Sequence, residues 1–328
     1  MLRWGVLSTA KIARVHLIPA ILAAEGSVLA AIASRDGNRA RALADDCGAP
    51  HAFGSYEALL DSDAVDAVYV PVPTAHHVEW ATKAVRAGKH VLVEKPLALK
   101  AADIEPLIAA RDEQGVVVAE AFMVKHHPQW AQVRDWIDAG RIGRLLHVQG
   151  AFSYFNDDPA NMRNVVELGG GALPDIGVYP IVVTRLVTGA EPVSALGRIE
   201  RDPRFGTDRF ADCTVDFDTF RLSFYVGTQA AARQSMVFHG SDGFIEIEAP
   251  FNAGVYGDTR VVLHDRGHQD AEIRRFPAVN QYREQVEAFS RRVAGEAVAI
   301  FSLEESVLNQ RVVDALLRSE SSGRHESV

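Results

Sequence analysis

The sequence has few cysteines, no long apolar run and no excess of basic residues. Cys47 and Cys213 stand far apart without metal-binding or redox spacing, so we expect reduced structural thiols, as in the cytoplasm. A net charge of −9 without a basic block argues against binding to the phosphate backbone of nucleic acid. No stretch reaches about eighteen apolar residues, so we expect no membrane span. Met1–Trp4 leads straight into a strand rather than a secretory apolar region.

The sequence also lacks a metal-binding motif. His126 and His127 are adjacent, but neighbouring side chains on an extended segment point to opposite sides. Pro128 follows them, which favours a helix start over a pair of metal ligands. We therefore expect no metal site.

A chain of 328 residues is long enough for two domains, and the sequence pattern changes near residue 122. Before this point, continuous apolar strands alternate with helical segments, which predicts an α/β domain, residues 1–122, with a doubly wound parallel sheet. After it, residues 123–328 predict an α+β domain with an open, mostly antiparallel sheet, whose last helix packs back on the first domain. The final residues, Ser319–Val328, are polar and predicted to fray.

The first strand–helix junction resembles a weakened dinucleotide fingerprint. Ser8, Ala10 and Ala13 stand at the three glycine positions of G-x-G-x-x-G, where small residues let the backbone approach a pyrophosphate. The alternative is a tight turn without a ligand. If a dinucleotide binds here, it contacts the junction residues Ser8, Thr9, Ala10, Lys11 and Ile12.

The end of the second predicted strand reads Ser34-Arg35-Asp36, with Arg39 one helical turn later. Sites that prefer NAD place an acidic residue here to bind the ribose 2′-hydroxyl, whereas a guanidinium and a hydroxyl suit a 2′-phosphate. We therefore expect NADP. NAD remains the alternative, because Asp36 either caps the next helix or binds a hydroxyl.

Three further side chains are typical of proton handling. Lys95 ends a strand, where open α/β sheets place ligands. Asp175 and Tyr179 follow the glycines Gly169–Gly171 and stand four residues apart on a predicted helix, which places them on one face. Each has a simpler explanation: an exposed lysine, a residue at a helix start, and a half-buried aromatic ring.

Several segments together resemble the Gfo/Idh/MocA oxidoreductase family, especially its branch of dihydrodiol and NADP-dependent D-xylose dehydrogenases. They are the weakened fingerprint, Pro71–Thr74, Ala87–His90, Glu94–Pro96, Glu120–Met123, His127–Pro128, Gly169–Tyr179 and Gly240–Glu246. The resemblance implies a Rossmann domain, a second domain whose open sheet forms a homodimer or higher homo-oligomer, and Lys95, Asp175 and Tyr179 as catalytic residues. It also places Pro71, Thr74, His77 and Glu94 beside the cofactor.

We assign three more residues to the substrate side as candidates, Phe122, His127 and Arg163; Arg163 is equally well explained as a surface arginine. The expected function is NADP-dependent hydride transfer to or from an aldose, such as D-xylose or glucose, or a trans-dihydrodiol. Tyr179 or Lys95 would transfer the proton. The alternatives are a glycosidase that uses the nicotinamide without net turnover and a cofactor-binding regulator without catalysis.

Overall fold

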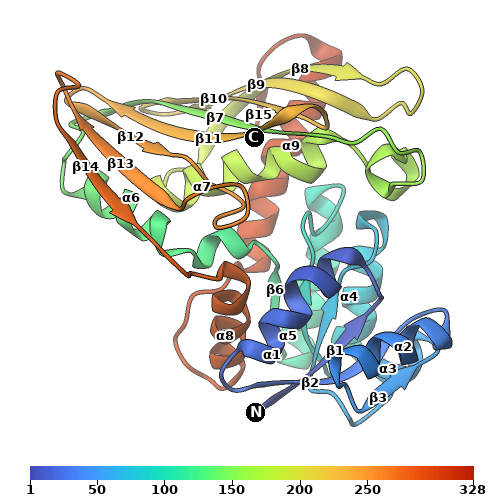
Figure 1. The fold of residues 1–328 in the computed structure, drawn as a ribbon. Helices are drawn as coiled ribbons and strands as arrows, with labels where there is room; N and C mark the ends of the chain where they lie inside the picture. The colour runs from blue at the N-terminus through green and yellow to red at the C-terminus, as the bar shows by residue number, and fades with distance from the viewer. The chain divides into compact units, whose positions relative to one another are not determined.

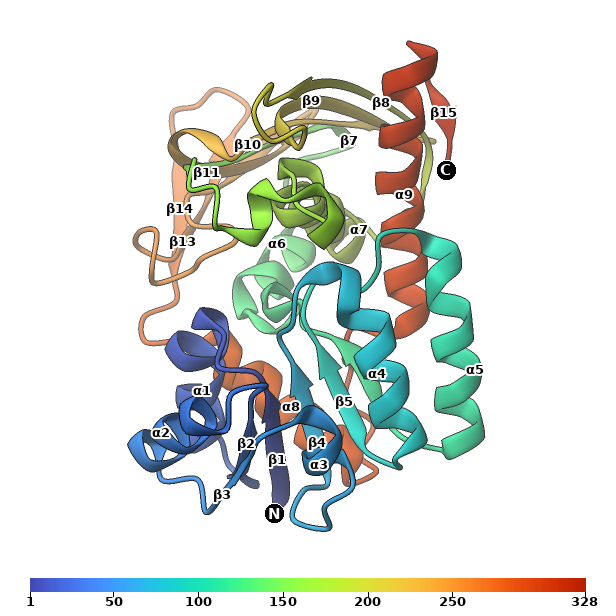
Figure 2. The ribbon, with the colours of Figure 1, turned by 90° about the vertical axis from the view of Figure 1, so that its right-hand side faces the viewer.

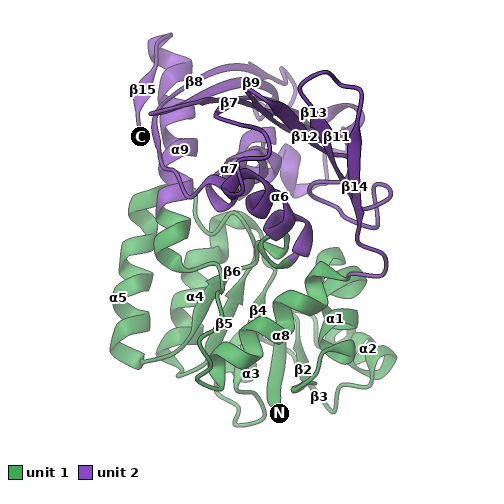
Figure 3. Cartoon of the chain, turned by 90° about the vertical axis from the view of Figure 1, so that its left-hand side faces the viewer, with its two compact units in different colours: residues 1–126, 280–307 green, residues 127–279, 308–328 purple.

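The computed structural model describes all 328 residues and divides into two compact units (Figure 3). Unit 1 comprises Met1–His126 and Asn280–Val307, and unit 2 comprises His127–Val279 and Leu308–Val328. The sequence placed all of 123–328 in one domain. Residues 280–307 belong instead to unit 1, because helix α8 (Gln281–Val293) packs on that unit and its Phe289 ring lies 5.1 Å from the Trp4 ring.

Unit 1 contains a six-stranded parallel sheet in the order β3-β2-β1-β4-β5-β6 (Figure 1). The strand order changes direction between β1 and β4, as in doubly wound dinucleotide-binding folds. The predicted parallel sheet is therefore confirmed. Its strands are β1 Leu2–Leu7, β2 Ser27–Ala33, β3 His51–Phe53, β4 Ala67–Val70, β5 His90–Val93 and β6 Val118–Glu120.

Apolar side chains alternate across this sheet and form a core on each face. Leu7, Val70 and Val93 belong to the core shared with α3, α4 and α5, while Trp4 and Tyr69 belong to the core shared with α1, α2 and α8. Figure 2 shows α4 and α5 on the opposite side of the sheet from α1 and α2. The remaining helices of unit 1 are α1 Ile18–Ala23, α2 Gly37–Cys47, α3 Tyr56–Leu60, α4 His77–Arg86 and α5 Glu105–Gln114.

Unit 2 contains a nine-stranded sheet in the order β14-β13-β12-β11-β7-β10-β9-β8-β15. Neighbouring strands are antiparallel except β7 and β10, which run parallel. The mostly antiparallel prediction is confirmed. The strands are β7 Leu145–Phe155, β8 Pro192–Arg201, β9 Asp208–Phe217, β10 Arg221–Gly227, β11 Gln229–Gly240, β12 Gly243–Ile247, β13 Arg260–Asp265, β14 Ala271–Arg275 and β15 Glu326–Ser327.

Helices α6 (Pro128–Asp138) and α7 (Val178–Thr188) cover one face of this sheet, and the opposite face carries no helix (Figures 1 and 2). The stretch Val166–Thr188, which includes α7, has the length and apolar composition of a membrane-crossing helix. However, 61% of its most apolar window is buried inside the protein, the pattern of a core helix.

The C-terminal residues are ordered by contacts that the sequence did not reveal. Helix α9 extends over Leu303–Ser322, and β15 pairs with β8. Ser319 is 1% exposed; its hydroxyl accepts a hydrogen bond from Gly197 N–H at 2.7 Å and donates one to the Leu316 carbonyl. The predicted fraying from Ser319 onward is therefore wrong, because a polar side chain at this place satisfies buried backbone groups.

The glycines before α7 allow unusually close packing. Gly171 has φ = 136°, and a Cβ atom there would lie 1.8 Å from Oδ1 of Asp208. The other oxygen of Asp208 accepts a hydrogen bond from the Leu173 N–H at 2.6 Å, at the start of a π-helical segment, Leu173–Gly177. A Cβ atom on Gly170 would lie 2.4 Å from the carbonyl oxygen of Arg163. These glycines therefore bring Asp208 and Arg163 against the start of the helix.

We predict that Gly171→Ala lowers the free energy of unfolding by about 3 kcal/mol or more, because the new methyl group overlaps Asp208 in a strained backbone. Gly189→Ala, at the other end of α7, is the matched control. Gly189 has φ = 64° and no other atom lies within 4 Å of the place that a Cβ atom would take, so the cost there is about 1 kcal/mol of backbone strain. Urea denaturation measures both, and equal losses would contradict the packing argument.

Candidate active site

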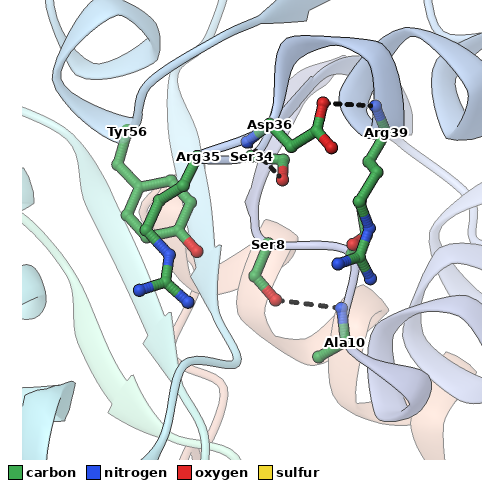
Figure 4. A pocket seen from close by; sticks show the side chains of 8 residues that line it. Ser8, Ala10, Ser34, Arg35, Asp36, Arg39 and Tyr56 are labelled. Atoms are coloured by element: carbon green, nitrogen blue, oxygen red, sulfur yellow. Dashed lines mark hydrogen bonds between the residues drawn. The ribbon is translucent and has the colours of Figure 1, made fainter.

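The carboxyl ends of β1 and β2 form a pocket of unit 1. Directly after β1, Ser8 adopts φ = 136°, a conformation usually left to glycine, and its Oγ accepts a hydrogen bond from Ala10 N–H at 2.9 Å. The first fingerprint position thus keeps the backbone shape of glycine although the residue is serine. The pocket has a volume of about 510 Å³ and is lined by Ser8, Thr9, Ala10, Ser34, Arg35, Asp36, Arg39 and Tyr56 (Figure 4).

The carboxylate of Asp36 is used as a helix cap. Its Oδ1 accepts hydrogen bonds from the N–H groups of Asn38 at 2.9 Å and Arg39 at 3.3 Å, at the start of α2. Asp36 N–H in turn donates to the Ser34 hydroxyl. Asp36 therefore acts as the helix cap that the sequence analysis gave as one of its two roles.

Two guanidinium groups reach into the same pocket. Figure 4 shows the side chains of Arg35 and Arg39 on either side of Ser8. Paired guanidinium groups beside a serine hydroxyl suit a phosphate monoester, which offers charge and several acceptor oxygens. The pocket therefore fits the 2′-phosphate of NADP better than the bare hydroxyl of NAD.

Tyr56 is a pocket residue that the sequence did not identify. It is 8% exposed and lines the pocket beside Ser8 and Arg35. Burial raises the pKa of Tyr56, while the charges of Arg35 and Arg39 act against this rise. The only sequence signal was an aromatic residue after the short strand β3, which the apolar pattern did not predict.

The predicted residues Lys11 and Ile12 do not line the pocket. Lys11 is exposed, and Ile12 is half-buried at the start of a helical segment. Pro71 and Thr74 lie buried in the loop after β4. Of the predicted junction residues, the structure therefore brings Ser8, Thr9 and Ala10 together at the pocket.

His77 connects the loops that follow β4 and β5. It is 1% exposed; Nδ1 lies 2.8 Å from the Pro96 carbonyl oxygen and Nε2 lies 2.7 Å from the Val72 carbonyl oxygen. Burial lowers the pKa of His77 to about 4, so its ring is neutral at physiological pH. Its ring nitrogens face backbone atoms, and it therefore positions the Lys95–Pro96 segment.

The same segment is held from its other side by two buried polar side chains. The Tyr69 hydroxyl donates to Glu94, the residue before the half-exposed Lys95. Glu120, at the end of β6, accepts a hydrogen bond from Leu97 N–H at 2.8 Å. Burial raises the pKa of Glu120 to about 7, although the nearby charge of Lys95 opposes the rise. Lys95 thus projects from a fixed strand end.

Asp175 and Tyr179 lie in unit 2. Asp175 lies in the π-helical segment; its side chain is 12% exposed and pairs with Arg163 at 2.8 Å. Tyr179 is 5% exposed, and its ring packs against Phe152 and Phe251 with centroids 5.5 Å away in each case. The predicted helix is confirmed, although its first turn is π-helical, a distortion often found at functional sites.

Two candidate substrate residues are corrected by the structure. Phe122 is fully buried and packs on Phe301 with ring centroids 4.7 Å apart, so it is a core residue. His127 is 1% exposed and caps α6, because its Nδ1 accepts a hydrogen bond from Gln129 N–H at 3.1 Å. Neither side chain is accessible to a substrate. No cluster of potential metal ligands is present either.

Comparison with known proteins covers most of the chain. A family model described as "Oxidoreductase family, NAD-binding Rossmann fold" (GFO_IDH_MocA) matches residues 2–122, and the GFO/IDH/MocA C-terminal domain matches residues 130–246. The chain is 37% identical to dTDP-3,4-didehydro-2,6-dideoxy-alpha-D-glucose 3-reductase from Actinomadura kijaniata, over 96% of this chain and 94% of the relative. It is 34% identical to D-xylose 1-dehydrogenase (NADP(+)) 2 from Haloferax volcanii, over 98% of each.

A solved structure with a similar fold is that of KijD10, a 3-ketoreductase from Actinomadura kijaniata. A tyrosine-to-phenylalanine mutant of that enzyme, in complex with TDP-benzene and NADP, superposes with a TM-score of 0.91. The sequence identity is 32%, and the superposition covers 97% of each chain.

The raised pKa of Glu120 predicts a pH-dependent contribution to stability. A carboxyl whose folded pKa exceeds its unfolded value stabilises the folded state most below the unfolded pKa of 4.5, and this is lost as the pH rises through about 7. We therefore expect the free energy of unfolding to fall less from about pH 5 to pH 8 in Glu120→Gln than in the unmodified protein. Urea denaturation at both pH values tests this. Glu113→Gln, on the exposed face of α5, is the control and leaves the difference unchanged.

Proposed function

We propose that this chain, which belongs to the Gfo/Idh/MocA oxidoreductase family, transfers a hydride between NADP and a carbinol carbon of a sugar. The protein is an NADP-dependent oxidoreductase of sugar-related substrates. The observation that carries the proposal is the nucleotide pocket, where Asp36 is occupied as a helix cap between Arg35 and Arg39. The cap uses one oxygen of the acid on which an NAD site relies, and two arginines stand beside it in the pocket.

The nicotinamide supplies the hydride acceptor or donor when the cofactor is bound, and the protein handles the proton. In the oxidising direction the substrate hydroxyl loses its proton as the adjacent carbon loses a hydride. We propose that Tyr179 accepts this proton and returns it to the developing alkoxide in the reducing direction. A tyrosine has an ordinary pKa of ~10, and we propose that the ammonium of Lys95 favours the phenolate. Asp175 would orient the substrate.

We propose an aldose such as D-xylose or glucose as the substrate. The support is the relative named a D-xylose 1-dehydrogenase, whereas the relative named a 3-reductase favours a nucleotide-linked keto sugar as the second candidate. A trans-dihydrodiol is the third. We further propose that the helix-free face of the unit 2 sheet joins two copies of the chain, and that the enzyme works in the cytoplasm, where its two free cysteines stay reduced.

A single absorbance assay tests these choices. Reduced nicotinamide is followed with D-xylose, D-glucose, a trans-dihydrodiol and, in reverse, a dTDP-linked keto sugar, each with NADP and NAD. We expect stoichiometric NADPH formation with an aldose. Release of a free sugar from a glycoside without net nicotinamide turnover would support the glycosidase, and cofactor binding without turnover of any substrate would support a regulator.

Arg35→Ala should weaken NADP binding by about tenfold to a hundredfold while leaving NAD binding nearly unchanged, because a charge-assisted bond to the 2′-phosphate is lost. Calorimetry or fluorescence titration of both cofactors measures the difference. The control is Arg41→Ala, since Arg41 lies on the helix that follows Arg35 but pairs with Asp45 outside the pocket. An equal loss of NAD affinity would argue against a phosphate contact.

Tyr179→Phe should lower kcat by about a hundredfold to ten-thousandfold, the usual contribution of a general acid or base. NADP affinity should stay within a few-fold, because the phenol acts on the substrate. The mutant ring keeps its packing against Phe152 and Phe251, which separates catalysis from folding. Near-normal turnover with an unchanged pH profile would shift the proton transfer to Lys95.

A further inference from the structure

Two donors from different parts of unit 2 converge on one oxygen of Asp175. The Tyr154 hydroxyl, near the end of β7, donates to Oδ2 of Asp175 at 2.5 Å. Nε of Arg163 donates to the same Oδ2 at 2.8 Å. Neither of these two bonds uses Oδ1. A carboxylate fixed by two donors on one oxygen has a defined orientation, which a helix start alone does not provide.

Arg163 is itself held in place by its backbone. Its carbonyl oxygen packs against Gly170, where a Cβ atom would approach to 2.4 Å, and its N–H donates to the Asn161 side chain at 3.1 Å. Its side chain is 41% exposed, while that of Asp175 is 12% exposed. The pair therefore sits at a partly open surface on a rigid segment.

The charges of this cluster affect one another. The carboxylate of Asp175 holds the pKa of Arg163 above its ordinary value, so the guanidinium is charged at any working pH. Tyr179, four residues after Asp175 in the sequence, acts on the pKa of Arg163 in the same direction. Burial and the Asp175 carboxylate raise the pKa of Tyr154, which therefore remains a neutral donor.

An uncompensated carboxylate close to Tyr179 would oppose ionisation of the phenol, because like charges disfavour the charged form. The groups of unit 2 that face this region are Tyr154 on β7, Arg163 on its 3-10 segment, Asp175 and, acting on Tyr154, Asp208 on β9; the ring neighbours of Tyr179 are uncharged. Arg163 is the one cation among them.

We propose that Arg163 is a positioning residue whose guanidinium, with the Tyr154 hydroxyl, orients the Asp175 carboxylate and neutralises its charge beside Tyr179. Asp175 then accepts a hydrogen bond from the substrate without suppressing proton transfer by the Tyr179 phenol. This replaces the interpretation of Arg163 as a substrate contact, and it rests on the proposed function of Tyr179 as the acid and base. Tyr154 is a second positioning residue for the Asp175 carboxylate. The sequence analysis did not identify it as a site residue.

The test follows Tyr179 ionisation directly and needs no turnover. Ultraviolet difference titration of the full chain against Tyr179→Phe isolates this residue among the seven tyrosines. We expect Arg163→Gln to move the midpoint upward by about one pH unit, because the Asp175 charge is no longer compensated. Arg163→Gln combined with Asp175→Asn removes both charges and returns the midpoint towards that of the unmodified protein. Arg163→Lys retains the charge and shifts the midpoint less than Arg163→Gln.

Two results overturn the proposal: an unchanged midpoint in Arg163→Gln, or a shift that persists in the double mutant. The first would mean that Arg163 does not act on Tyr179, and the second that it does not act through Asp175. The control is Arg266→Gln, since Arg266 pairs with Asp242 on a surface turn of the same unit. The titration tests the role of Arg163 independently of the proposed function. If the protein turned over none of the sugars, the proposed function would be refuted, but the Tyr179 titration midpoints of the variants could still be compared.

Activity gives a second readout where turnover is found. A positioning role predicts that Arg163→Gln and Tyr154→Phe lower kcat, and that the pH profile of kcat shifts upward in Arg163→Gln. A direct substrate contact predicts instead a higher KM with an unchanged profile. That second pattern would contradict the proposal.

Discussion

The helix that carries Asp175 and Tyr179 depends on one buried hydrogen bond, from Leu173 N–H to the carboxylate of Asp208 at 2.6 Å. The first N–H groups of a helix have no partner within it, and an acidic side chain satisfies both the donor and the dipole. Asp208 approaches so closely that residue 171 has no room for a side chain. The neighbouring Gly170 meets the backbone of Arg163 in the same way. One capping interaction and two glycines thereby fix both partners of the ion pair beside Tyr179.

In unit 1, backbone groups at the carboxyl edge of the sheet also need side-chain partners. The loops after β4 and β5 have left the strand ladder, and their backbone groups need other partners. His77 and Glu120 provide them: the ring nitrogens of His77 lie against the carbonyls of Pro96 and Val72, one of which accepts its single N–H, and Glu120 accepts from the N–H of Leu97. Burial shifts the pKa of both anchors towards the neutral form, to about 4 and about 7. His77 is a neutral anchor and Glu120 is partly protonated near neutral pH, whereas the ion pair of Arg163 and Asp175 keeps its charges.

The sequence predicted the regular secondary structure of the protein and the type of each sheet. Regular apolar strands and helices gave the parallel sheet and the mostly antiparallel one, and residue chemistry pointed to Arg35 and Lys95 after strand ends and to Arg39 in the helix that follows. Prediction from the sequence failed where one residue type can take several structural roles. Phe122 belongs to a matched motif but is core, because exposure depends on packing against Phe301, nearly 180 residues later in the chain. Tyr154 contacts Asp175 across 21 residues of sequence, and no local pattern marks such a partner.

Asp36 shows why cofactor preference is difficult to read from residue identity. An acid at the end of the second strand is the usual mark of an NAD site, yet the same residue type is among the best helix caps. Which role it takes depends on where the next helix begins. Here α2 starts at Gly37, so the backbone N–H groups of Asn38 and Arg39 turn towards Asp36 and donate to its Oδ1. A helix starting a few residues later would leave that carboxylate to the ribose. The register of α2, as much as the two arginines, therefore favours the phosphorylated cofactor.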